Sequence, residues 1–288
     1  MNRRHLLYLA AGATLVTGTF ALGQDNPAKL RVALLPDENA ATIIQNAEPL
    51  KQYLQSKLHK DIELVVTTDY SSMIEAMRFG RIEVAYFGPL SYVLAKSKAP
   101  DIEPFAVGVS KGSPTYKSVI IAQADGPVKT IEDVKGRMVG FGDPASTSSH
   151  LIPRALLAKH ELIGDKDYKF VHLGAHDAVA RAVQSGQVQV GGLSQEILNN
   201  LIARKSIDAG KVRVVAVSDP IPNYPMVLQS KLDPQLKASL RQAFLELKDA
   251  AVLKPFRAEG FVPTDDHAYD ILRETAKVLN LDLTKFKG

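Results

Sequence analysis

Four consecutive hydroxyl residues lie in the middle of the chain, within the stretch Gly142-Asp143-Pro144-Ala145-Ser146-Thr147-Ser148-Ser149. The apolar residues 137–141 before this stretch predict a strand, and residues 150–157 after it predict a helix with Pro153 in its first turn. Hydroxyls and free backbone N–H groups at the start of a helix together bind oxyanions. The hydroxyl run therefore predicts a site for a small, phosphate-like ligand.

The sequence patterns that mark metal and cofactor sites are missing. The seven His residues are scattered without ligand spacing and the chain has no Cys, so we expect no metal site. There is no P-loop, no G-x-G-x-x-G stretch and no nucleophile elbow, so we expect no cofactor. Ser146 or Ser148 could act as a nucleophile, but no base stands at a recognisable spacing. An exported serine-dependent hydrolase stays open as an alternative from another class.

Short apolar runs alternate with amphipathic helical patterns along the chain, which predicts α/β architecture with parallel sheets covered on both faces. Ligands of such folds bind at the carboxyl ends of strands and in crevices between domains. Ser72 and Glu75 predict a capping box for one of the helices. The expected strands are 30–35, 62–67, 84–87, 105–110, 118–122, 137–141, 170–173, 188–191 and 212–217. The expected helices are 47–58, 72–79, 90–95, 131–134, 150–157, 177–184 and 195–203, and residues from 233 onward are expected to be helical.

Polar and aromatic side chains lie next to several of these strands, where a ligand in a cleft would be met. Tyr70 follows one strand, Tyr116 precedes another, and His176 and Tyr224 come shortly after two more. Each alone is better explained as a packed ring or a helix cap. The hydroxyl run favours a ligand, because consecutive Ser and Thr suit a first turn better than a helix interior.

The N-terminus has the pattern of a secretory signal. A basic head precedes the apolar residues 6–22, and small residues stand where a signal peptidase cuts, so we expect residues 1–23 to be removed. Arg3 and Arg4 suit a twin-arginine signal as well as the general export route. The absence of Cys excludes disulfides and a lipid anchor on an N-terminal Cys, which favours the periplasm. Loss of both arginines lowers the formal charge from +4 to +2, which does not indicate nucleic-acid binding.

Several stretches together resemble the phosphonate- and phosphite-binding proteins of ABC transporters. They are Thr68–Gly80 with Val84–Gly88, the hydroxyl stretch with Leu151 and Pro153, Ala175–Ala178 with 182–183 and 186–188, and Ser218–Pro222. The resemblance covers essentially the whole mature chain. It implies a type II periplasmic binding protein with two α/β lobes, two crossover strands (near 116–122 and 217–224) and a ligand cleft between the lobes.

The resemblance also implies the domain limits and the partners. Lobe 1 would comprise residues 24–117 plus 222–288, and lobe 2 residues 118–221. The partners would be a small phosphorus oxyanion and the membrane permease of an ABC transporter, with no nucleic acid and no enzymatic activity. We expect a monomer. A sensor subunit that reports ligand occupancy to a membrane kinase is an alternative within the same fold.

The residues implied to bind the ligand are Tyr70, Tyr116, Ser146, Thr147, Ser148, His176 and Tyr224. Family members that take an aminoalkyl phosphonate have an acidic residue after the Pro220-Ile221-Pro222 turn, where this chain has Asn223 and Tyr224. Tyr224 would fill that end of the site, which favours phosphite or methylphosphonate. A larger phosphonate such as 2-aminoethylphosphonate, or phosphate, is the alternative ligand.

Four further expectations concern charge and local structure. No Lys or Arg is assigned to the site, and His176 is expected to become protonated beside the bound anion. Asp219, the acid nearest the turn, is expected to serve structure. Ser149 stands where the family often has Gly, and is expected to tighten the turn.

Overall fold

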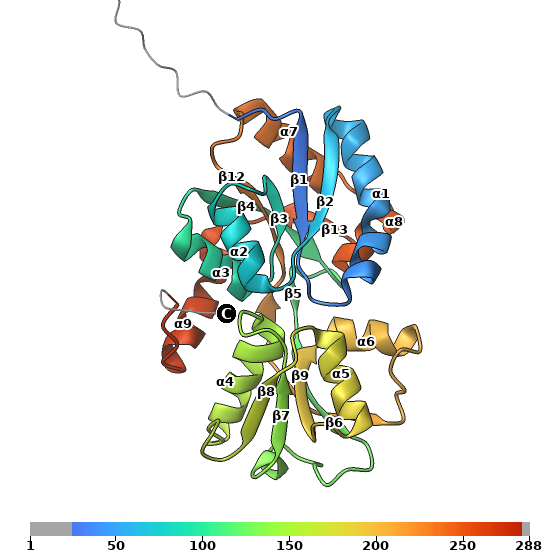
Figure 1. Ribbon diagram of the computed structural model, residues 1–288, viewed down its shortest axis with the longest axis vertical. Helices are drawn as coiled ribbons and strands as arrows, with labels where there is room; N and C mark the ends of the chain where they lie inside the picture. The colour runs from blue at the N-terminus through green and yellow to red at the C-terminus, as the bar shows by residue number, and fades with distance from the viewer. Residues whose placement is uncertain (1–24, 284–288) are drawn as a thin grey trace, which may run out of the picture.

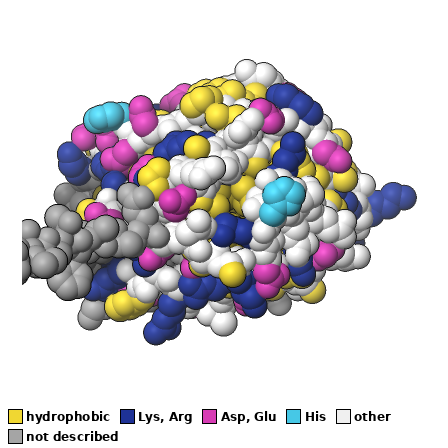
Figure 2. Space-filling model, turned by 90° about the horizontal axis from the view of Figure 1, so that it is seen from above, with side chains coloured by type: hydrophobic (Ala, Val, Ile, Leu, Met, Phe, Trp, Pro, Cys, Tyr) yellow, Lys and Arg dark blue, Asp and Glu magenta, His cyan; other side chains and the backbone are white. Residues whose placement is uncertain are grey.

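The computed structural model describes residues 25–283, so the expected signal segment 1–23 lies outside the described residues. Two α/β lobes lie one above the other, each built on one mixed β-sheet (Figure 1). Within residues 25–283, no helix is long and apolar enough to cross a membrane. Figure 2 looks onto the end formed by the first lobe, where acidic and basic side chains are interspersed, as the near-balanced composition indicates.

The first lobe contains a six-stranded sheet in the order β13-β4-β12-β3-β1-β2. Its first three strands along the chain run parallel, whereas β12 pairs antiparallel with both β3 and β4, and β13 pairs antiparallel with β4. The strands are β1 (Lys29–Leu34), β2 (Asp61–Val66), β3 (Val84–Tyr86), β4 (Ile102–Val109), β12 (Pro225–Gln229) and β13 (Gly260–Pro263). The helices are α1 (Ala40–Leu58), α2 (Tyr70–Arg78), α3 (Pro89–Lys98), α7 (Pro234–Leu245), α8 (Ala250–Leu253) and α9 (Asp270–Val278), with 3₁₀ turns at Lys254–Phe256 and Asp266–Tyr269.

The second lobe contains a five-stranded sheet in the order β10-β6-β9-β7-β8. β7 runs parallel to β8 and β9, and β6 pairs antiparallel with β9 and β10. The strands are β6 (Ser118–Gln123), β7 (Met138–Phe141), β8 (Lys169–His172), β9 (Val190–Ser194) and β10 (Val212–Val217). The helical segments are a 3₁₀ turn at Glu132–Val134, the π-helical turn η2 (Thr147–Leu151), α4 (Ile152–Lys159), α5 (His176–Ser185) and α6 (Gln195–Ala203).

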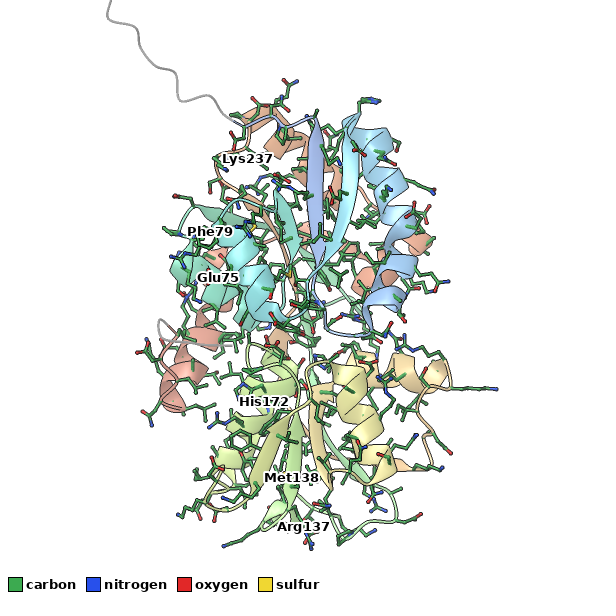
Figure 3. All side chains as sticks on the ribbon, in the orientation of Figure 1. Glu75, Phe79, Arg137, Met138, His172 and Lys237 are labelled. Atoms are coloured by element: carbon green, nitrogen blue, oxygen red, sulfur yellow. The ribbon has the colours of Figure 1, made fainter. Side chains whose placement is uncertain are left out.

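A two-stranded sheet lies where the chain passes between the lobes. β5 (Thr115–Tyr116) and β11 (Ile221–Pro222) pair antiparallel, with Tyr116 opposite Ile221. β7 starts far from this junction, since Arg137 and Met138 lie at the outer end of the second lobe (Figure 3). The strand then runs toward the first lobe, so the hydroxyl run that follows it emerges at the junction.

The apolar core joins the two lobes at the hydroxyl run. One cluster fills the first lobe, and two smaller clusters cover the two faces of the second sheet. Ala145 and Leu151, which flank the hydroxyl run in the second lobe, belong to the first lobe's cluster and are fully buried. Burial of these two residues therefore presses the hydroxyl run against the opposite lobe.

Three expectations from the sequence are wrong. The sheets are mixed rather than parallel, because chain segments return between the lobes to pair antiparallel at positions that local periodicity does not specify. Residues 260–263 form an edge strand in a region expected to be helical. Helix α2 starts at Tyr70 and its cap is Asp69, whose carboxylate accepts from the Ser72 N–H at 2.7 Å, so Ser72 and Glu75 are not the capping box.

Candidate ligand-binding site

The hydroxyl run forms a helix start, although not the one expected. Its π-helical turn begins at Thr147 rather than at His150, and α4 continues from it. Ser146 is the N-cap: its Oγ accepts from the Ser149 N–H at 3.2 Å, and its carbonyl accepts from the Leu151 N–H at 3.1 Å. The wider π turn places the hydroxyls inside the first turn, and such turns occur frequently at functional sites.

Ser149 ties this turn to the sheet. Its hydroxyl donates to the Gly192 carbonyl of β9. A Cβ atom on Gly142 would lie only 2.6 Å from Ser149 Oγ, so the strand end and the turn approach this closely only because residue 142 is Gly. The hydroxyl proton of Ser149 is thus used inside the lobe, in agreement with the expected role in the turn.

Two hydrogen bonds connect the segment to the first lobe. Thr147 Oγ1 accepts from the Leu90 N–H at 2.8 Å, at the start of α3. Asp143 Oδ2 accepts from the Tyr70 N–H at 3.2 Å, and its other oxygen accepts from the Ala145 N–H at 2.7 Å. Burial raises the pKa of Asp143, while these two N–H donors oppose the shift. The two lobes are therefore in direct contact around the hydroxyl run.

Three buried hydroxyls at this contact find no hydrogen-bond partner among the described residues: Tyr70 Oη, Tyr116 Oη and Ser148 Oγ. The hydroxyls of Ser148 and Thr147 lie beside the Tyr116 phenol, and that of Ser146 lies beside the Tyr70 phenol. Burial raises the pKa of both phenols, so both stay protonated and can donate. Buried polar atoms are almost always paired in native proteins, so three such hydroxyls in one place are well suited to bind a polar ligand.

His176 completes the cluster as a neutral donor. Its Nδ1 accepts from the Ser194 N–H at 3.0 Å, which leaves the proton on Nε2, 3.4 Å from Ser146 Oγ. Burial, reinforced by the nearby positive charge of Arg257, lowers the pKa of His176 to about 3. Without an anion the ring is therefore neutral. Protonation beside a bound anion, which would break the bond from Ser194, stays a prediction.

The cluster offers donors but no free charge. Ser146 and Thr147 accept hydrogen bonds from backbone N–H groups and keep their own protons to donate, as does Ser148. An anion held by such groups receives charge-assisted hydrogen bonds, which are stronger than neutral ones. The six donors are the side chains of Tyr70, Tyr116, Ser146, Thr147, Ser148 and His176.

Three tyrosine rings, Tyr86, Tyr116 and Tyr224, form an aromatic wall beside these donors. The Tyr224 ring is 4 % exposed, and its centroid lies 5.1 Å from that of Tyr116 and 5.3 Å from that of Tyr86. Asn223 does not face the cluster: its amide donates to the Gly108 carbonyl and accepts from the Tyr224 N–H, both at 2.9 Å. The structure thus brings all seven residues expected at the site to one interlobe region.

A narrow pocket leads outward from the aromatic wall. Its volume is about 10 Å³, close to that of one water molecule, and Tyr116, Tyr224, Glu196 and Arg257 are among its lining residues. It continues into an open cleft of about 960 Å³ that shares Glu196 and Arg257. Tyr116 belongs to both the pocket and the donor cluster, so the pocket is the side of the site nearest the open cleft.

The sequence analysis missed Glu196 and Arg257 at this pocket. Glu196 is the second residue of α6, which follows β9 directly, and its charge raises the pKa of Tyr116 in addition to burial. Its position after a strand was a usable signal. Arg257 is buried, and it donates to Asp37 Oδ2 at 2.5 Å, so its charge is paired. It lies in a stretch expected to be helical, where no pattern marked it.

Asp219 lies outside the site. Its side chain is 88 % exposed and it pairs with Lys159 at 3.3 Å on the surface of the second lobe. An exposed ion pair of this kind contributes little to stability. The first residue after Pro222 that faces the site is therefore Tyr224, because Asn223 does not face it. This residue is a tyrosine and not a carboxylate.

Comparison with known proteins identifies the family. Residues 32–269 match the profile of the family described as ABC transporter, phosphonate, periplasmic substrate-binding protein. The phosphonates-binding periplasmic protein of Escherichia coli is 28 % identical over 277 residues, covering 90 % of this chain and 82 % of that protein. The phosphate-import protein PhnD of Mycolicibacterium smegmatis is 26 % identical over 301 residues, covering 96 % of this chain and 93 % of that protein.

The fold matches as well. The crystal structure of the binding protein of a Pseudomonas aeruginosa ABC phosphonate transporter superposes with a TM-score of 0.82 at 26 % identity, covering 89 % of this chain and 87 % of that one. The family profile spans most of the chain. The protein therefore belongs to the family of periplasmic substrate-binding proteins of phosphonate ABC transporters.

Proposed function

We propose that this protein is the periplasmic receptor of an ABC importer for phosphite or methylphosphonate, bound between the two lobes. The observation that carries the proposal is the group of six neutral donors around the unpaired hydroxyls of Tyr70, Tyr116 and Ser148. A PO₃ group has three oxygens, and two hydrogen bonds to each would use six donors. These bonds would replace the hydration that the anion loses on entering the site.

The aromatic wall supports a compact ligand. Tyr224 and Tyr116 stack beside the donors, and the pocket beyond them has room for about one water molecule. A hydrogen or methyl group on phosphorus would contact these rings without loss. The fourth oxygen of phosphate would be left unpaired against them, at a cost of about 1–3 kcal/mol. Phosphate is therefore the weaker ligand in this proposal, although one relative is named for phosphate import.

A second candidate is 2-aminoethylphosphonate, and Glu196 is the observation that favours it. This carboxylate lines the narrow pocket together with Tyr116 and Tyr224, where it could pair with an ammonium group. Arg257 lines the same pocket and opposes a cationic tail, although Asp37 compensates part of its charge. We rank this ligand second because the wall leaves it little space.

The organisation around the receptor is part of the proposal. We propose lobe limits at residues 24–117 plus 222–288 and 118–221, supported by the two-stranded sheet of β5 and β11 between the two larger sheets. We also propose export through the N-terminal signal, a monomeric state, and delivery of the ligand to a membrane permease. The family's description as an ABC transporter component supports the permease partner.

Isothermal calorimetry of the mature chain from Gln24 tests the ligand. We expect nanomolar-to-micromolar binding of phosphite or methylphosphonate, with weaker binding of 2-aminoethylphosphonate and phosphate. No heat with either of the first two ligands would refute the proposal. A preference for 2-aminoethylphosphonate would instead establish the second candidate and make Glu196 its partner.

Two variants test the site. His176→Ala and Ser146→Ala should each weaken binding of the anion by about 1.5–3 kcal/mol, because each removes a hydrogen bond to a charged group. Lys159→Ala, on the exposed pair with Asp219, is the matched control and should bind like the wild type. Unchanged affinity in both site variants would refute the proposed site, even if the proposed ligand were correct.

A further inference from the structure

Arg257 is a buried cation in an unfavourable backbone conformation. Its φ is 53°, in the left-handed region that is unfavourable for residues other than glycine. Its guanidinium donates to Asp37 Oδ2 at 2.5 Å and to Glu38 Oε1 at 3.4 Å, and the side chain is 12 % exposed. A buried arginine persists only when it is well paired, and strain of this kind is often found at functional sites.

This arginine supports the aromatic wall. The guanidinium carbon lies 5.6 Å from the centroid of the Tyr224 ring, a cation–π contact. The preceding residue, Phe256, packs its ring 4.9 Å from Tyr86, and its carbonyl accepts from the Tyr86 hydroxyl at 3.3 Å. The consecutive residues Phe256 and Arg257 therefore contact two rings of the aromatic wall, those of Tyr86 and Tyr224.

Tyr224 is also confined from another direction. A Cβ atom on Gly88 would lie 3.2 Å from Tyr224 Cε1 and 3.2 Å from Leu35 Cδ2, which is tighter than ordinary van der Waals contact. The ring therefore packs directly against the backbone at the start of α3. With Gly88, Tyr86 and Tyr116 already in contact, the guanidinium of Arg257 is the charged member of the group that fixes the ring.

The two residues that hold Arg257 also contact the second lobe, Asp37 through its backbone and Glu38 through its carboxylate. The Asp37 carbonyl accepts from the His176 N–H at 3.0 Å. Glu38 forms an ion pair with Arg204, the residue that ends α6. When the lobes are in contact, the segment that anchors Arg257 is thus fixed by the same lobe that supplies the donors of the hydroxyl run.

We propose that Arg257 is a positioning residue that holds the Tyr224 ring against the anion site and thereby limits the size of the group attached to phosphorus. The inference rests on the proposed function, because it assumes that a phosphonate occupies the site. Without the guanidinium, the ring loses one of its contacts and can move toward the narrow pocket that both residues line. Longer substituents would then fit.

The double variant Asp37→Asn, Arg257→Met tests this, because it removes the cation and its main carboxylate together and leaves no unpaired buried charge between them. Calorimetry measures the dissociation constants of methylphosphonate and propylphosphonate. The ratio of propylphosphonate to methylphosphonate constants should fall about tenfold relative to the wild type, the loss expected for a desolvated cation–π contact. Arg257→Lys keeps the charge without the planar face, so the ratio should fall by a smaller factor.

Arg204→Met is the matched control. It removes an arginine from the same ion network but on the opposite lobe, so it should weaken both ligands by one factor and leave their ratio unchanged. An unchanged ratio in the folded double variant, or in Arg257→Lys should the double variant not fold, would overturn the inference. A wild-type protein that binds neither phosphonate would instead refute the proposed function, whatever the variants do.

Discussion

The hydroxyl run and the two phenols of Tyr70 and Tyr116 line the same site, but they differ in how far the protein already satisfies them. In the run, Ser146 and Thr147 accept from backbone N–H groups and Ser149 donates to a carbonyl, so only Ser148 is unpaired among the described residues. Both phenols are unpaired. The run's hydrogen bonds to the protein therefore hold its shape, whereas the phenols are available to donate to a ligand.

The difference has an energetic meaning. A buried hydroxyl without a partner costs about 1–3 kcal/mol, so a ligand bonded to the phenols would stabilise the contact between the lobes. A ligand that satisfies the phenols and Ser148 removes this cost and adds charge-assisted bonds. The most conspicuous segment of the sequence is thus mainly scaffold, and most of the unsatisfied recognition groups come from elsewhere in the chain.

The largest effect should come from the phenols. The double variant Tyr70→Phe, Tyr116→Phe should weaken methylphosphonate binding by about 3 kcal/mol or more, because each hydroxyl bonded to a charged ligand contributes about 1.5–3 kcal/mol. The ligand-free protein should be no less stable, because neither hydroxyl has a partner to lose. Calorimetry and urea unfolding measure the two quantities.

Tyr53→Phe is the control for this pair. The Tyr53 hydroxyl donates to the Ala243 carbonyl at 2.6 Å, so its removal should lower the free energy of unfolding by about 1 kcal/mol and leave affinity unchanged. Were the double variant to lose stability while keeping its affinity, the contrast between scaffold and recognition groups would be reversed.

A second prediction concerns pH, because His176 Nδ1 accepts from the Ser194 N–H only as a neutral ring. Burial lowers the pKa of His176 and of His150 to about 3, so the unfolded chain binds more protons than the folded protein at mildly acidic pH. Burial raises the pKa of Asp37 to about 6, which has the opposite sign and offsets one of the two. Counted over these three groups, the unfolded chain binds about one proton more than the folded protein. Together they lower stability on acidification by about 1.4 kcal/mol per pH unit between about pH 4 and 6.

Urea unfolding of the ligand-free protein across this range measures the slope. A profile that is flat, or that gains stability toward acid, would show that a buried histidine of the folded protein is protonated in this range.

The smallest expected effects separate two adjacent serines. Ser148→Ala should weaken ligand binding by about 1.5 kcal/mol without lowering the free energy of unfolding, since its hydroxyl has no partner among the described residues. Ser149→Ala should lower the free energy of unfolding by about 1 kcal/mol through loss of the bond to Gly192, with affinity nearly unchanged. If Ser148→Ala lowered stability and Ser149→Ala lowered affinity, the proposed division of roles within the hydroxyl run would be contradicted.

Local patterns predicted much of the fold. Strand β10 and helix α6 have the limits expected from the sequence, because apolar periodicity within each segment reports directly on its burial. The π turn at Thr147 was not predicted, since its hydrogen bonds depend on how Ser149 meets Gly192 in another strand. Strands β12 and β13 were missed because they are short and pair at a distance.

The sequence predicted the site residues that lie together in the hydroxyl run. The family resemblance pointed to further single residues such as His176. Arg257 could not be found in this way. It meets Asp37 across 220 positions of sequence, and nothing in its own neighbourhood distinguishes it from a surface arginine. Arg257 can support the Tyr224 ring only in the folded protein, where β1, the 3₁₀ turn before Arg257 and Tyr224 have come together.

The small β5–β11 ladder has a mechanical consequence. Tyr116 is one of its four residues and is paired with Ile221, so an unpaired phenol of the site is built into the joint itself. Any bending of that joint turns the phenol relative to the hydroxyl run. If the proposed permease separates the lobes, the same motion would withdraw the Tyr116 phenol from the proposed anion. Release of the ligand would then need no other change.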